Sequence, residues 1–366
     1  MKKNLLSMAC LLFCIITYAQ QKTVNVATAG TLTTLLNDDE VENLTDLKLA
    51  GNLNGTDINL IRKMGGGDNY WDYDGANSKY VEYGHLQNLD LSEVHIVSGG
   101  DPYLDIWKSS RIYTKDDVLT ASMFACCDNL ITVSLPKTVK TVEEDLFNGC
   151  YHLKTVEFPE VSELGGHMFY DCPSLEKVDL PKSVTKIGDA FFCCANHLKE
   201  VSMPSVKELK DSVFAGCTCL EKLYIGGIEK IDIGTFEGDL NLKYVYLPAG
   251  VTNICDGAFK DCNNLIQIIS MSAIAPSCDA DAFSGVDKNC TVYVQIGSGA
   301  NYKSAPEWKK LNIVEKDLSG IIPSVIQQDQ KEVARYNAAG IQIKKATRGV
   351  NIIRMNNGTT KKVWIK

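Results

Sequence analysis

The feature that most constrains this chain of 366 residues is a phrase that recurs at steps of 22 to 24 residues. Each copy contains a phenylalanine that is followed three positions later by cysteine in six of the eight copies. A Leu-x-x-Val-x-Leu-Pro stretch and a second apolar pair then lead to the next phenylalanine. The phenylalanines are Phe124, Phe147, Phe169, Phe191, Phe214, Phe236, Phe259 and Phe283, and the cysteines are Cys127, Cys150, Cys172, Cys194, Cys217 and Cys262. A period in this range is the signature of a solenoid.

A single copy cannot fold alone. It offers about six large apolar side chains, worth ~2 kcal/mol each when buried, whereas ordering each of its residues costs about 1.5 kcal/mol. Stacked neighbours supply the missing burial and backbone pairing. The Leu-x-x-Val-x-Leu stretch alternates as a strand does, the second apolar pair predicts another short strand, and the phenylalanine segment predicts a tight helical turn. We therefore predict a β-rich, right-handed solenoid of parallel strands with short helical turns, capped at both ends.

The repeat resembles the BspA-like leucine-rich repeats of bacterial surface proteins of Bacteroidetes. The stretch from Lys177 to Leu198 matches almost throughout, and "VTNICDGAFKDCNNL" is another good copy, whereas "YIGGIEKIDIGTFEGDLNL" lacks both the cysteine and the proline. The resemblance implies a leucine-rich-repeat fold. It also implies an adhesin at the cell surface that binds host matrix proteins, other bacteria or glycans.

The N-terminus predicts export. Lys2 and Lys3 precede an apolar stretch from Leu5 to Ile16, and a small-x-small signal ends at Ala19. This pattern is typical of a signal peptide over residues 1–19. The apolar stretch is shorter than the ~20 residues that span a bilayer, so no transmembrane helix is expected. A lipoprotein anchored at Cys10 and an uncleaved anchor are the alternatives.

Composition shifts divide the remaining chain. We expect an N-terminal cap with a partial repeat (20–85), the solenoid (86–289), a C-terminal cap (290–315), a linker (316–330) and a small C-terminal β tail (331–366). In the N-terminal cap, "GTDINLIRKM" predicts a short helix with Asp57 near its N-cap. In the C-terminal cap, a short helix is expected near Ser304 to Lys310.

The tail resembles the C-terminal sorting domain of the type IX (Por) secretion pathway. The resemblance rests on Gly340, on the stretch "GVNI" and on the basic Lys361, Lys362 and Lys366. It implies interaction with secretion machinery, passage across the outer membrane and cleavage there. Short strands are expected on both sides of an Asn-Gly hairpin signal at 357–358.

The cysteines allow three interpretations, namely disulfides, metal binding and buried thiols. Removing Cys10 and Cys14 with the signal peptide leaves twelve of the fourteen. Parallel strands ~4.8 Å apart hold the repeated cysteines too far apart for a disulfide, whose Cβ atoms lie ~3.8 Å apart. No CxxC or HExxH motif suggests a metal site. We favour an inert packed ladder, and leave open a disulfide between Cys278 and Cys290 in an oxidising compartment.

No catalytic motif is present. The chain has neither a G-x-S-x-G elbow nor a phosphate-binding loop, and a dyad of Cys150 with His152 or of Cys194 with His197 would place its cysteine in the packed ladder. Asp72 and Asp74, beside aromatic residues in the loop 68–75, allow the alternative of a glycan-processing or other extracellular hydrolase. This loop is otherwise an insertion that packs over the first coil. We predict no enzymatic activity, no cofactor and no metal.

A binding surface is the expected function. The net charge of −8 argues against nucleic acid, which requires a basic stripe. Tyrosines at outward strand positions of adjacent coils predict an exposed patch that binds a protein or glycan; ordinary strand preference is the alternative explanation. The candidate ligand-binding residues are Tyr224, Tyr244, Tyr246, Trp71 and Tyr73. We expect an exported, non-enzymatic surface adhesin or binding module, with a passive surface spacer as a further alternative.

Overall fold

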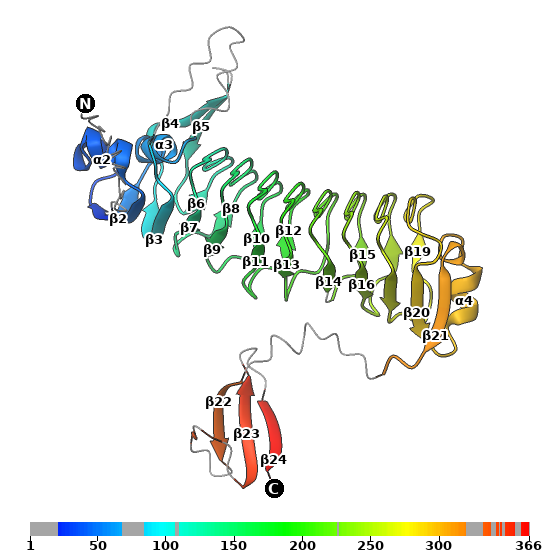
Figure 1. Cartoon of the computed structure of the whole chain (residues 1–366). Coiled ribbons are helices and arrows are strands. Elements are labelled where there is room, and N and C mark those ends of the chain that lie inside the picture. Colours follow the sequence, from blue (N-terminus) through cyan, green and yellow to red (C-terminus); the bar gives the residue numbers. More distant parts are fainter. Residues whose placement is uncertain are drawn as a thin grey trace, which may run out of the picture.

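The computed structural model describes residues 21–67, 84–106, 110–224, 227–319, 332–337, 342–343, 345, 348–355 and 360–365. The chain winds into a long stack of coils, as Figure 1 shows, and parallel strands of successive coils lie side by side. The predicted leucine-rich-repeat solenoid is confirmed.

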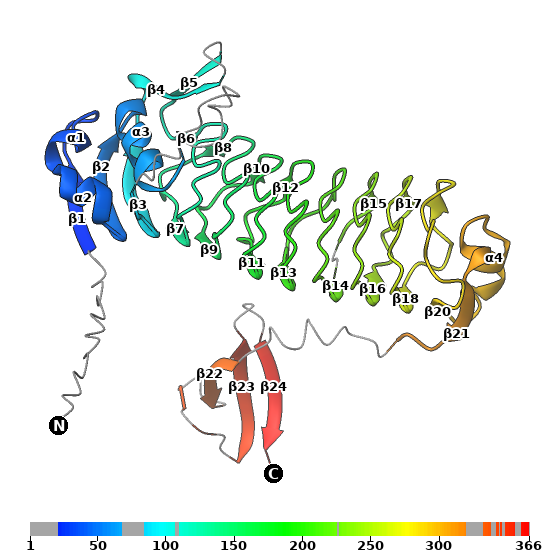
Figure 2. The same ribbon diagram turned by 45° about the horizontal axis from the view of Figure 1, so that its top comes forward.

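Two rows of strands run along the stack, and Figure 2 separates them. The first strand row consists of β1 (Gln21–Val26), β2 (Asp46–Leu53), β3 (Asn88–Ile96), β7 (Thr132–Ser134), β9 (Thr155–Glu157), β11 (Lys177–Asp179), β13 (Glu200–Ser202), β14 (Lys222–Tyr224), β16 (Tyr244–Leu247), β18 (Gln267–Ser270), β20 (Thr291–Gln295) and β21 (Asn312–Lys316). The second strand row consists of β6 (Val118–Leu119), β8 (Thr141–Val142), β10 (Glu163–Leu164), β12 (Lys186–Ile187), β15 (Lys230–Ile231), β17 (Asn253–Ile254) and β19 (Ser277–Cys278). Turns close each coil on its remaining side.

Alternation within the first strand row separates the core from the surface. Val178 and Val245 are buried, whereas their neighbours Lys177 and Tyr244 are exposed. Strand register places Lys177 beside Glu200 and Tyr244 beside Gln267, as the repeat period predicts. Pairing also continues from β3 through β2 to β1, so the same sheet runs across residue 85 into the N-terminal cap.

A column of stacked phenylalanine rings fills the turn side of the core. Neighbouring ring centroids lie 5.1 to 5.9 Å apart, and the ring planes are within 19° of parallel. The column consists of Phe124, Phe147, Phe169, Phe192, Phe214, Phe236, Phe259 and Phe283.

One copy differs from the predicted alignment by a single residue. Phe192, and not Phe191, stacks on Phe169, whereas Phe191 meets Phe192 edge-on at 4.8 Å. Ala195 consequently takes the buried cysteine position, and Cys194 lies half-buried in the turn. The prediction of Phe191 and Cys194 for the stacked columns is wrong because the second phenylalanine of "FFCCA" takes the stacked position, although only the first is followed three residues later by cysteine.

The phenylalanine segments are turns and not helices. In most coils, two positions of the turn adopt positive φ, as Ala190 (48°) and Cys194 (64°) do in one copy. A right-handed helix requires negative φ, so such a segment cannot continue as one. Turn amides instead donate to carbonyl oxygens of the next coil, for example from Phe147 to Met168 at 3.0 Å.

The N-terminal cap replaces a missing coil with side-chain donors. Because turn amides donate forwards along the stack, the carbonyls of the first turn have no preceding coil to serve them. Arg62 donates to the oxygens of Met123 and Ala125 at 3.1 and 3.2 Å, and the Tyr103 hydroxyl donates to Ala121 at 2.7 Å. Arg62 is itself buried. This arrangement satisfies carbonyls that would otherwise be orphaned in the core.

The elements of the N-terminal cap are α1 (Leu32–Leu35), α2 (Asp38–Asn43), α3 (Gly55–Met64) and the antiparallel strands β4 (Gly99–Ile106) and β5 (Ser110–Thr114). Helix α3 carries Arg62. Its N-cap is Asn54, whose side chain accepts a hydrogen bond from the Thr56 amide. The Asp57 carboxylate in turn accepts a hydrogen bond from the Asn54 amide, which completes a capping box. The predicted helix with Asp57 near its N-cap is therefore confirmed, with Asn54 as the N-cap itself.

The C-terminal cap covers the end of the phenylalanine column. Trp308 packs on Phe283 with ring centroids 4.9 Å apart, and its indole N–H donates to the Pro276 oxygen. The single helix expected near Ser304 to Lys310 is divided into α4 (Gly299–Ser304) and the short 3₁₀ helix η1 (Trp308–Lys310).

The tail forms an antiparallel sheet of β22 (Glu332–Asn337), β23 (Gly349–Met355) and β24 (Thr360–Ile365), with β23 in the middle. Strands β23 and β24 lie on the two sides of the Asn-Gly signal, where the sequence predicts short strands. The Asn-Gly signal at 357–358 and Gly340 lie outside the described residues.

Candidate ligand-binding face

The outward side of β16, β18 and β20 carries the most distinctive surface of the solenoid. Tyr246 lies beside Ile269, and Ile269 beside Tyr293, in consecutive strands. In the adjoining row, Tyr244 lies beside Gln267, and Gln267 beside Thr291. We call this set the aromatic–amide face; it consists of Tyr244, Tyr246, Gln267, Ile269, Thr291 and Tyr293.

The predicted tyrosines share this region in backbone register. Tyr244 is 39% exposed and Tyr246 is half-buried. Tyr224 pairs with Tyr246 through its backbone, and its side chain lies outside the described part of the structure. Sequence reasoning missed Tyr293, although it follows Tyr246 and Ile269 at the repeat period and "TVYVQ" shows the same alternation.

The aromatic–amide face contains no acid or base other than tyrosine. The side chains at its edge are polar or cationic: the Asn312 amide donates to the Thr291 hydroxyl at 3.2 Å, and the Lys316 ammonium lies 4.9 Å from the centre of the Tyr293 ring. Burial raises the pKa of Tyr246 above its usual value, so this hydroxyl remains a neutral donor and acceptor at physiological pH.

The same strand row is charged further towards the N-terminus. On β11 and β13, Lys177 forms ion pairs with Glu200 at 3.0 Å and with Asp179 at 3.5 Å. These side chains are half or more exposed, and such pairs contribute ~0–1 kcal/mol to stability. The first strand row therefore carries ion pairs on β11 and β13 and the aromatic–amide face on β16, β18 and β20.

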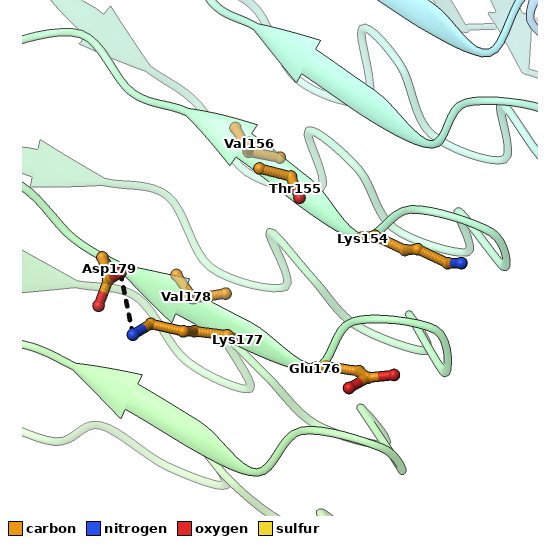
Figure 3. A pocket seen from close by; sticks show the side chains of 7 residues that line it. All are labelled: Lys154, Thr155, Val156, Glu176, Lys177, Val178 and Asp179. Atoms are coloured by element: carbon orange, nitrogen blue, oxygen red, sulfur yellow. Dashed lines mark ion pairs between the residues drawn. The ribbon is translucent and has the colours of Figure 1, made fainter.

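A shallow groove of about 340 Å³ lies on the charged half, between β9 and β11 (Figure 3). The first strand row has no backbone pairing at this place, although both strands are described. The coil of β9 is one residue shorter after its proline than the next coil, and Val156 is only half-buried. The groove is lined by Lys154, Thr155, Val156, Glu176, Lys177, Val178 and Asp179. Its mixed charges and open shape provide no arrangement for catalysis.

The histidines of the two candidate dyads have structural partners. His152 Nδ1 lies 2.7 Å from the Asp128 backbone oxygen, and His197 Nδ1 contacts the Pro173 oxygen in the same way. Asn241 and Asn264 occupy the same turn position and donate to the preceding coil. These side chains form an inter-coil ladder.

The thiols of the column also bond to backbone. Cys150 donates to the Phe124 oxygen at 3.1 Å, and burial raises its pKa well above the usual value. A protonated, enclosed thiol is a poor nucleophile.

Trp71, Tyr73, Asp72 and Asp74 lie outside the described residues. All twelve cysteines after residue 20 are free thiols, including Cys278 on β19 and Cys290 before β20. Within the described ranges, no three His, Cys, Asp or Glu side chains form a group suited to a metal ion. None of the helices in that part of the chain has the length and apolar character needed to cross a bilayer.

A family comparison identifies the repeat. The model for the BspA-type leucine-rich repeat region matches residues 118–239 and 229–299, with six copies. Residues 118–299 therefore match the BspA-type leucine-rich-repeat family. The match begins at β6 and includes the coils that carry Tyr244 and Tyr246. A search of curated proteins found no match.

Several solved structures are similar to this chain. A leucine-rich repeat protein from Bacteroides ovatus is 18% identical, with 63% of this chain and 61% of that chain covered and a TM-score of 0.41. A leucine-rich cell surface protein from Faecalibacterium prausnitzii is 20% identical, with coverage of 50% and 63% and a TM-score of 0.33. A leucine-rich repeat protein from Eubacterium ventriosum is 18% identical, with 73% of this chain and 58% of that chain covered and a TM-score of 0.40. The chain thus spans about three fifths of the length of these proteins.

Proposed function

We propose that this BspA-type repeat protein is an exported, non-enzymatic binding module of the cell surface, and that it holds a protein or glycan ligand on its aromatic–amide face. The observation that carries the proposal is the run of Tyr246, Ile269 and Tyr293 across three paired strands, next to Tyr244 and Gln267. Tyrosine supplies a large, rigid contact area at low entropy cost.

The chemistry of the face favours an uncharged ligand surface. Amide and hydroxyl groups of Gln267 and Thr291 can donate and accept hydrogen bonds beside the aromatic rings. A charged ligand group would find no opposite charge among the six residues of the face. Neutral sugars and apolar or amide-rich protein surfaces have the matching properties.

Export rests on the sequence features of residues 1–19 and on the surface location typical of the family. The antiparallel sheet of β22, β23 and β24 is compatible with the sorting domain that the tail resembles. On this proposal, the solenoid is the binding unit and the tail directs secretion.

The proposal is tested by a binding screen of the full mature chain against matrix proteins and a glycan array. Three proteins are compared, namely the unchanged chain, a Tyr244→Ala/Tyr246→Ala variant and a control with Lys177→Ala/Glu200→Ala. The control alters the same strand row at the ion pair of β11 and β13. Circular dichroism verifies that both variants fold.

A ligand that binds the unchanged chain and the control but loses at least ~10-fold in affinity for the tyrosine variant supports the face. A ligand that loses affinity only for the control variant would place the binding site at the ion-paired strands β11 and β13 instead. The absence of any ligand in the screen contradicts the binding function and favours a passive spacer.

A further inference from the structure

Two cysteines have no packing role in the column. Because Ala195 takes the buried position of its coil, Cys193 and Cys194 are displaced into the outer part of the turn. Both are half-buried, and their Sγ atoms lie 3.6 Å apart. The burial that explains Cys150 or Cys172 therefore does not explain this pair.

The backbone holds Cys194 in a conformation that side chains rarely adopt. Its φ is +64°, and the equivalent turn positions in other coils are glycine at 149, 216 and 238 and Cys126, Asp171 and Asp261 elsewhere. A residue other than glycine in this region costs about 1–2 kcal/mol. Gly216 is also the neighbour of Cys194 in the next coil, where a Cβ atom would lie 3.6 Å from the Cys194 Sγ.

A second adjacent pair provides an internal comparison. Cys126 and Cys127 have the same spacing, but Cys127 occupies the core column and Cys126 is only 5% exposed. The Cys126 thiol contacts the Asn148 backbone oxygen at 3.6 Å. The chain thus contains one enclosed pair and one accessible pair in equivalent turns.

We propose that Cys193 and Cys194 form a redox-active dithiol that is oxidised by a low-molecular-weight disulfide, such as glutathione disulfide, to an intramolecular disulfide. The Cys194 thiolate attacks one sulfur of the disulfide, breaks its S–S bond and forms a mixed disulfide, and the first thiol leaves with a proton. Cys193 then attacks the Cys194 sulfur, and the second thiol leaves with the proton of Cys193. Two electrons pass from the pair to the oxidant.

The surroundings favour Cys194 as the attacking thiol. Burial raises the pKa of Cys193 to about 12, and the charge of Cys194 contributes to this rise. Once Cys194 is in the mixed disulfide, the charge contribution disappears while the effect of burial remains, and Cys193 attacks because its sulfur lies 3.6 Å from that of Cys194. Two groups held this close react far faster than two in free solution.

Oxidation would act on the joints between coils. The Cys194 amide donates to the Ala215 oxygen at 2.8 Å, and the Asp171 amide donates to the Cys193 oxygen at 2.9 Å. Joining the two adjacent sulfurs requires rotation of the backbone that makes these bonds. The disulfide is therefore expected to loosen the turn between the coils of Phe169 and Phe214.

The test uses the folded full chain, reduced and then exposed to glutathione disulfide, with alkylation and tryptic mass spectrometry at successive times. Trypsin separates the two pairs: the peptide 187–199 carries Cys193 and Cys194 as its only cysteines, and the peptide 116–137 carries Cys126 and Cys127. We expect the thiols of the first peptide to be oxidised at least ~10-fold faster than those of the second. Oxidation appears as the loss of two hydrogens and of both alkylation sites. The proposal would be overturned if both peptides were oxidised at the same rate. It would also be overturned if the thiols at 193 and 194 both stayed open to alkylation at every time point.

Two variants test the order of the steps. Cys193→Ser is expected to stop at a stable mixed disulfide on Cys194, whereas Cys194→Ser is expected to form no adduct at Cys193. An adduct at Cys193 as fast as that at Cys194 would contradict the assigned roles. Amide hydrogen exchange at Asp171 and Cys194 is expected to increase on oxidation of the unchanged chain, and unchanged exchange would contradict the loosening.

Discussion

The Cys262 thiol donates a hydrogen bond to the backbone oxygen of Phe236 in the preceding coil, across 3.1 Å. The same bond joins Cys150 to Phe124, Cys172 to Phe147 and Cys217 to Phe192. A small thiol thus fills the core and satisfies a carbonyl that faces it. Repetition of this contact explains these four cysteines without catalysis or a disulfide.

Asp239 breaks this column and should weaken it at neutral pH. Its carboxyl is fully buried without a hydrogen-bond partner on either oxygen. Burial raises its pKa well above the usual value, and only the Cys217 backbone acts in the opposite direction. The folded chain therefore holds the proton on this carboxyl to a higher pH than the unfolded chain, which ionises it above pH ~4. Stability should be full below this pH and should fall as pH rises towards the folded-state pKa.

Asp239→Cys restores the repeat and should stabilise the chain by about 2 kcal/mol at pH 7, because it removes an unsatisfied buried group. Urea unfolding between pH 5 and 8 measures the change, and the variant should show a flatter pH dependence than the unchanged chain. Asp261→Asn, at an exposed turn position, is the control. A lower urea midpoint for Asp239→Cys would contradict this account of the column.

Arg62→Met should open the N-terminal end of the solenoid. The substitution keeps much of the buried volume but removes the donors to Met123 and Ala125, at a cost of about 3 kcal/mol. Amide exchange of residues 118–127 should accelerate before that of the central coils. Lys63→Met alters the half-buried neighbour on α3 and should leave exchange unchanged. Equal protection in both variants would show that the side-chain cap is dispensable.

Ala195→Cys tests the alignment of the irregular copy. The new thiol should enter the core column and point to the Phe169 oxygen, as Cys217 does to Phe192. We expect it to resist iodoacetamide in the folded chain as strongly as Cys172, while Cys194 is alkylated at least ~10-fold faster. Peptide mapping distinguishes the sites. Rapid labelling at 195 together with protection at 194 would restore the alignment on Phe191.

The sequence predicted those features that depend on the period. Strand rows, inward valines and the position of Tyr244 follow from alternation repeated at 22 to 24 residues. The alignment of "FFCCA" did not follow, because the Phe-x-x-Cys pattern favours Phe191 with Cys194, whereas the structure stacks Phe192 and buries Ala195. The contacts of Arg62 and Tyr103 with the first turn could not be predicted from the sequence either, because they join segments far apart in the chain and follow no motif.

The candidate site was predicted in part for the same reason. The register of Tyr244 and Tyr246 is periodic, but the contrast between the ion-paired strands and the aromatic–amide face of the same strand row becomes visible only when the ion pairs of Lys177 are placed. Trp71 and Tyr73 lie in a segment without repeats, and their part in binding stays a prediction.

The measurement that tests the central claim most directly is the salt dependence of affinity for the ligand that the screen recovers. The aromatic–amide face carries no acid or base other than tyrosine, so ligand release should not depend on screening of ion pairs. We predict that the dissociation constant changes less than ~2-fold between 50 and 500 mM NaCl, and that the Tyr244→Ala/Tyr246→Ala variant binds more weakly throughout. An affinity that falls ~10-fold or more with salt would place the ligand on charged groups and contradict the account.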